Sequence, residues 1–137
     1  MELNDYSSRL LAVLLLAFPE FGERVAAGPE AGCFTVEFPA PSGSTFWVAT
    51  EDFDRITVGF DAHHVHFGGW AESVDARDFD NAVEYIRRLM AGEYLVAVWS
   101  RDGALAGSVT FRRGETPQPW GSGEGLALAV KGWHPPG

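Results

Sequence analysis

The sequence predicts an α+β domain in which two helices pack on one face of an antiparallel sheet of six or seven strands. Three observations support this fold class. Residues 10–18 form an unbroken apolar run, and residues 79–90 place apolar side chains at helical spacing. Several short segments alternate apolar and polar side chains, as half-buried strands do. Turn residues separate these segments. The apolar faces of the two helices need a sheet to pack against.

The first helix is expected over LLAVLLLAF, residues 10–18, with Asn4 or Asp5 as its cap and Pro19 after its end. An export signal cleaved after Ala27 is the alternative interpretation. Acidic residues precede the run where export signals carry positive charge, and nine residues are too few to span a bilayer. We therefore expect a buried helix in a cytoplasmic protein.

An antiparallel meander of strands is expected next. CFTVEFPA, STFWVAT and RITVGF alternate apolar and polar residues, and PAPSG and EDFD between them are typical of turns. HHVHF either extends the third strand or forms a short fourth one. The only cysteine, Cys33, lies in the first of these segments, where we expect a buried thiol.

The second helix is predicted from Asp78, with Asp75 or Asp78 as its cap and Gly92 as its stop. The segment YLVAVWSRDGALAGSVTF then predicts a hairpin, because Asp102-Gly103 is typical of a type I′ turn. EGLALAV is expected to form the last strand.

A Pro- and Gly-rich loop, residues 112–125, separates the hairpin from this last strand. Loops of this length without regular structure are uncommon in compact domains and often carry function. Trp120 lies in its middle. This tryptophan either anchors a partner or folds back over the sheet edge.

Chain length and charge limit the classes of function that the protein can have. The 137 residues, 46% of them hydrophobic, fit one domain that buries a core without disulfides. Residues 1–92 carry 15 acidic and six basic side chains, whereas residues 93–137 carry four of each. The resulting charge of −9 disfavours binding to nucleic acids and anionic membranes. Any charged partner should therefore be basic.

The stretch DAHHVHFGGW, residues 61–70, holds three of the four histidines. In a strand His64 and His66 share a face, where such a pair can chelate zinc, and His63 points the other way with Asp61. The third ligand that zinc needs could come from an acidic residue, but no spacing selects one among Asp52, Asp54, Asp61 and Glu72.

We expect no cofactor, because the chain has neither a His-Glu-x-x-His helix nor a Cys-x-x-Cys pair. Zinc at His64 and His66 is kept as an alternative, and an acid–base site is another. The favoured interpretation is that the imidazoles lie at a strand end and hydrogen-bond to backbone or to neighbouring carboxylates.

Three segments carry a resemblance: ITVGFDAHHVHFGGW, FDNAVEYIRRLMAGEYLVAVWSRDGALAGS and GLALAVKGW. They look similar to small bacterial proteins of undetermined activity with a His-x-His-Phe strand element. Several of those are associated with polymorphic-toxin neighbourhoods, where small acidic cytoplasmic proteins serve as immunity factors. Gly68 stands where many of them have Asp, which removes a carboxylate partner for the histidines. The matching positions are Phe60, His64, His66, Phe67, Trp99, Gly103 and Trp133.

Three functional hypotheses follow. In the first, the protein binds a basic partner, such as a toxin that it inhibits, through its acidic surface. In the second, it is a metal-binding protein or a small hydrolytic enzyme centred on the histidines. In the third, it is a structural module whose strand edges pair in a homo-oligomer. The candidate partner-binding residues are Asp52, Asp54 and Trp120, and the candidate site residues are His63, His64, His66, Asp61, Trp70 and Glu72.

Overall fold

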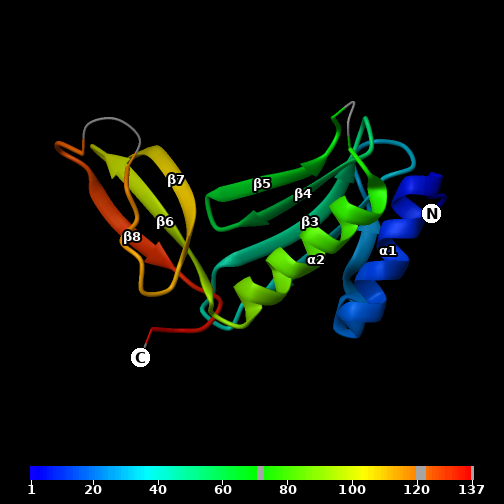
Figure 1. Cartoon of the computed structure of the whole chain (residues 1–137), viewed down its shortest axis with the longest axis horizontal. Coiled ribbons are helices and arrows are strands. Elements are labelled where there is room, and N and C mark those ends of the chain that lie inside the picture. Colours follow the sequence, from blue (N-terminus) through cyan, green and yellow to red (C-terminus); the bar gives the residue numbers. More distant parts are fainter. Residues whose placement is uncertain (71–72, 120–122, 137) are drawn as a thin grey trace.

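A computed structural model of the chain describes residues 1–70, 73–119 and 123–136 (Figure 1). In these residues two antiparallel sheets accompany the helices, which confirms the α+β class. Sheet A has the order β1-β2-β3-β4-β5, and sheet B has the order β7-β6-β8. The elements are α1 (Asp5–Ala17), a 3₁₀ helix η1 (Pro19–Arg24), β1 (Val25–Ala27), β2 (Phe34–Pro39), β3 (Thr45–Glu51), β4 (Arg55–Phe60), β5 (His63–Gly68), α2 (Asp75–Met90), β6 (Tyr94–Arg101), β7 (Ala104–Arg112) and β8 (Ala127–Lys131).

The single sheet that the sequence predicts is divided in two. After α2 the chain forms β6, which pairs with β7 on one edge and β8 on the other and does not extend sheet A. Figure 1 shows sheet B to the left of sheet A. The sequence did not indicate η1 or β1, because β1 is short and mostly exposed and so has no clear alternation. HHVHF forms a strand of its own, β5.

Helix α1 begins as predicted. The Asn4 side chain accepts a hydrogen bond of 2.7 Å from the Ser7 backbone N–H, which caps the first turn. Leu10 and Leu14 are fully buried, and the buried Ser7 hydroxyl lies 2.7 Å from that of Thr50 on β3. Among the described residues, no helix is long and apolar enough to cross a membrane.

Helix α2 corrects one prediction. Val74 occupies the capping position and makes no side-chain hydrogen bond, so neither Asp75 nor Asp78 is the cap. Both aspartates lie in the first turn, where their charge complements the helix dipole. The predicted apolar face is buried, and Gly92 adopts a φ of 78° just after the end of the helix.

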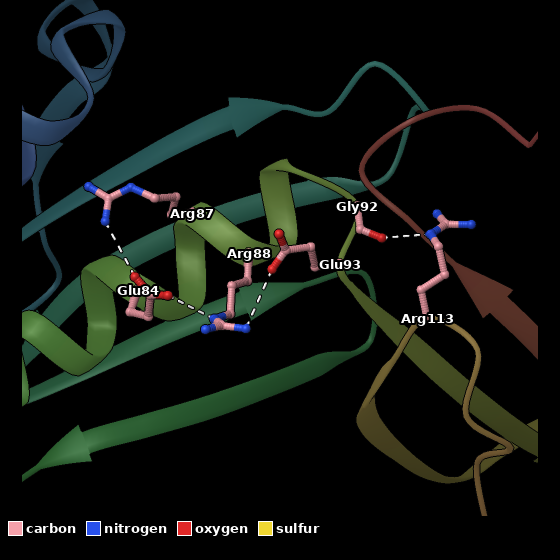
Figure 2. Close-up of polar contacts among 6 residues, drawn as sticks. All are labelled: Glu84, Arg87, Arg88, Gly92, Glu93 and Arg113. Atoms are coloured by element: carbon pink, nitrogen blue, oxygen red, sulfur yellow. Dashed lines mark hydrogen bonds and ion pairs between the residues drawn. The ribbon is translucent and has the colours of Figure 1, made fainter.

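Polar contacts connect the end of α2 to sheet B (Figure 2). Arg88 reaches Glu84 at 2.8 Å and Glu93 at 3.4 Å, and Arg113 donates through its Nε to the Gly92 carbonyl at 2.8 Å. Exposed ion pairs of this kind contribute little each. The Arg113 backbone N–H also donates to the Glu93 carbonyl, so the end of β7 is held beside the start of β6.

The residues after β8 return to sheet A and complete its core. The Trp133 ring lies 5.2 Å from Phe46 and 6.2 Å from Phe60, centroid to centroid, and is almost fully buried. Its carbonyl accepts a hydrogen bond from the Ser42 backbone N–H at 3.0 Å. Trp133 therefore holds the two sheets together.

This role predicts that Trp133→Ala lowers the free energy of unfolding by about 3–5 kcal/mol, because a large aromatic leaves a cavity in the core. Trp70→Ala is the control, since Trp70 is 70% exposed and its loss should cost less than about 0.5 kcal/mol. Urea unfolding of both variants measures the difference. Equal losses would contradict the assignment.

Candidate functional site

Sheet A buries one face and leaves the other open. Along β3, Phe46, Val48 and Thr50 are buried in the layer that both helices cover. Residues in the alternate positions lie on the opposite face, which we call the open face. Its central members are Thr35, Glu37, Trp47, Ala49, Glu51, Thr57, His64 and His66.

His64 and His66 lie on the open face together, as the sequence predicts, with ring centroids 5.1 Å apart. His66 Nδ1 lies 2.7 Å from the Thr57 hydroxyl, and that hydroxyl also bonds to Glu51 Oε1. An ionised carboxylate only accepts, so Thr57 donates its single proton to Glu51. The His66 Nδ1–H must then donate to Thr57, and the free lone pair is on Nε2.

Burial lowers the pKa of His66, and the charges of Arg55 and His64 lower it further, whereas Glu51 opposes them. The imidazole is therefore neutral near pH 7. A neutral imidazole with its tautomer held by Thr57 can accept a proton at Nε2.

His63 points away from this pair, as predicted. Its Nδ1 lies 2.7 Å from the Ser108 hydroxyl of β7, so it bridges sheet A and sheet B. Burial, followed by the charge of His64, lowers the pKa of His63. The three histidines do not form one site.

The remaining candidates are dispersed. Asp61 lies in the β4–β5 turn, where its carboxylate accepts from the Ala62 backbone N–H at 2.9 Å. Trp70 follows the opposite end of β5, about 20 Å away for a six-residue strand. Glu72 and Trp120 lie outside the residues that the structure describes.

The histidine pair offers few ligands to a metal. Within residues 1–70, 73–119 and 123–136, no group of three or more His, Cys, Asp or Glu side chains could hold a metal ion. The nearest carboxylate contact is 3.9 Å, between His66 Nδ1 and Glu51 Oε1. Because Nδ1 is engaged with Thr57, only Nε2 of His66 remains for coordination.

A second candidate surface lies at one end of sheet A, where the β3–β4 turn approaches the segment after β5 (Figure 1). We call it the acidic end and define it by Glu30, Asp52, Phe53, Asp54 and Trp70. The Asp52 backbone N–H donates to the Glu30 carboxylate at 2.6 Å. The neighbouring Asp52 carboxylate raises the pKa of Glu30. Negative charge is therefore concentrated there.

Two large aromatic side chains are exposed at the acidic end. Phe53 is 89% exposed and Trp70 is 70% exposed. Arg55 pairs with Gly68 across β4 and β5. Phe53 precedes Arg55 by two residues and Trp70 follows Gly68 by two, so the antiparallel register brings both to the same end of the sheet.

The sequence indicated part of this surface. Asp52 and Asp54 are predicted partner-binding residues, and Trp70 is a candidate both for the histidine site and, with Trp120, for the aromatic at the centre of an acidic interface. Phe53 and Glu30 were missed. The available signal was the turn EDFD, which places a large apolar residue between acids where a turn favours small polar ones.

Comparisons of the chain with protein-family models, with curated proteins and with solved structures find no match. The resemblance to proteins of polymorphic-toxin neighbourhoods therefore stays an expectation.

The lowered pKa of His63 predicts a pH-dependent stability. Below about pH 6.5 the unfolded chain binds a proton at His63 that the folded chain resists, so the free energy of unfolding falls as the pH falls. Urea unfolding at about pH 7.5 and about pH 5.5 should show a smaller loss in His63→Gln than in the wild type. His134→Gln is the control and should keep the full loss. An unchanged loss in His63→Gln would contradict this prediction.

Proposed function

We propose that this protein is a cytoplasmic binding domain that recognises a basic protein partner at its acidic end, in the manner of an immunity protein that inhibits a toxin. One observation carries the proposal. Phe53 and Trp70 are both exposed at the end of sheet A that also carries Asp52 and Asp54. Exposed aromatics grouped on a small surface are typical of interface anchors.

Several carboxylates outside the acidic end are paired with arginines. Arg9 pairs with Asp5 and Asp75, and Arg55 pairs with Glu51. Within the described part of the chain, Asp52 and Asp54 make no ion pair. No arginine, lysine or histidine of the described residues therefore neutralises either carboxylate.

The negative charge and the exposed aromatic side chains would affect different steps of binding, association and dissociation. Complementary charge speeds association and selects among partners, whereas buried aromatics slow dissociation. The net charge of −9 adds long-range attraction for a basic protein, and salt should weaken that attraction.

The test is capture of proteins from the producing cells by the immobilised chain, quantified by mass spectrometry for three forms. Besides the wild type, these are Phe53→Ser with Trp70→Ser, and a control with Leu105→Ser and Leu128→Ser. The control also removes two exposed apolar side chains, 60% and 50% exposed, but from sheet B.

We expect a basic protein that the wild type and the control capture and that the acidic-end variant loses by about tenfold or more. Raising the salt from about 0.05 M to about 0.5 M should reduce its capture. Equal capture by all three forms, or a partner of acidic composition, would argue against the proposal.

The bonded chain Glu51–Thr57–His66 favours a second candidate function, a small hydrolytic activity with His66 as proton acceptor. With p-nitrophenyl acetate as the probe, His66→Gln should lower the rate above background by at least about tenfold, and His64→Gln should lower it less. Similar rates in both variants would exclude a special role for His66.

A further inference from the structure

The open face of sheet A is hollowed on both sides of Trp47. A cavity of about 420 Å³ is lined by Arg24, Glu37, Phe38 and Trp47, among others. A second cavity of about 370 Å³ is lined by Glu30, Glu37, Trp47 and Glu51, among others. Both cavities are lined by Glu37 and Trp47, so they flank this pair of side chains on β2 and β3; we call the two together the Trp47 groove.

The indole of Trp47 is held in place by the strand beside it. Trp47 pairs with Glu37 on β2 and with Gly59 on β4. A Cβ atom at Gly59 would lie 2.1 Å from the Trp47 Nε1, so the ring rests on the bare backbone at this glycine. The rest of the ring lines the groove as a rigid aromatic platform.

The charges around this platform are mostly negative. Glu30, Glu37 and Glu51 line the groove, and Arg24 lies at one end with its guanidinium 5.7 Å from the Phe38 ring centre. Glu51 is already engaged by Arg55 and Thr57. Glu37 makes no ion pair or hydrogen bond with another described side chain. It is therefore the carboxylate available to a ligand.

An aromatic platform beside an unpaired carboxylate suits a cation. A guanidinium fits better than an ammonium, because it is planar, stacks on an indole and can donate two parallel hydrogen bonds to one carboxylate. The groove also joins the acidic end, since Glu30 lines it and accepts from the Asp52 backbone N–H.

We propose that the Trp47 groove receives an arginine side chain of the basic partner, with its guanidinium stacked on Trp47 and paired with Glu37. This inference rests on the proposed function and names the chemistry by which the partner is recognised. Phe53 and Trp70 anchor the partner, and the groove selects arginine.

The probe is N-acetylarginine methylamide, titrated into the isotopically labelled full chain and followed by nuclear magnetic resonance. N-acetylcitrulline methylamide is the matched control, because it keeps the shape of the side chain and lacks the charge. We expect the amide signals of Thr35 and Ala49 and the Trp47 indole N–H to shift with a Kd on the order of 1 mM. Citrulline should bind about fivefold or more weakly.

Two variants test the contacts. Glu37→Gln should weaken arginine binding by about threefold or more, because it removes the counter-charge from an exposed position. Trp47→Phe keeps a ring over Gly59 but replaces the indole with a weaker cation–π partner, so it should weaken binding by a similar factor. The shifts of the Thr35 and Ala49 amide signals measure this loss. Glu115→Gln, which lines neither cavity of the groove, should bind as the wild type does. Equal binding of arginine and citrulline, or unchanged binding in Glu37→Gln, would overturn the proposal.

One further variant distinguishes a failure of the groove proposal from a failure of the proposed partner binding at the acidic end. The variant Phe53→Ser with Trp70→Ser should keep arginine binding at the groove while it loses the partner. If this variant keeps both arginine binding and the partner, the groove proposal is supported and the acidic end is not the interface. If the wild type binds no arginine and the variant still loses the partner, the interface stands and the groove proposal is wrong.

Discussion

The one-sided burial of sheet A is the constraint on which the other features depend. Alternation along β3 and β4 sends Val48 and Val58 under the helices, where each buried aliphatic side chain stabilises the fold by about 1.5–3 kcal/mol. The same alternation sends Trp47 and Glu51 to the open face. Since α1 and α2 both cover the inner layer, the open face can hold polar groups, a fixed indole and a groove without loss of core packing.

Sheet B is attached to this framework by a few specific contacts. Trp133 enters the aromatic core, His63 meets Ser108, and the Tyr85 hydroxyl lies 2.7 Å from that of Thr110. These contacts leave β8 at a free edge with Leu128 and Val130 each 50% exposed.

Local sequence patterns predicted both α-helices and most of the strands, whereas the positions of the candidate sites depend on long-range strand register. The turn at Asp102-Gly103 follows from neighbouring residues, and so do the two alternatives for the cap, Asn4 or Asp5, and for HHVHF, an extension of the third strand or a strand of its own; the structure selects Asn4 and the separate strand β5. The division into two sheets depends on which strand β6 pairs with, which no local pattern encodes. The link from Glu51 to His66 joins three strands, and the pairing of Phe53 with Trp70 at one end depends on the register of β4 and β5. Neither could be predicted without the pairing.

If the acidic end is the surface that binds a basic partner, its backbone amides should respond first to a basic peptide. The most direct measurement is a map of backbone amide shifts during titration with a hexapeptide of alternating arginine and leucine, beside a control of alternating glutamate and leucine. We expect the arginine peptide alone to shift the amide signals of residues 52–54 and 69–70 most strongly, with those of the Trp47 groove next. Largest shifts around the carboxylates of Glu84 and Glu115, or equal shifts with both peptides, would contradict it.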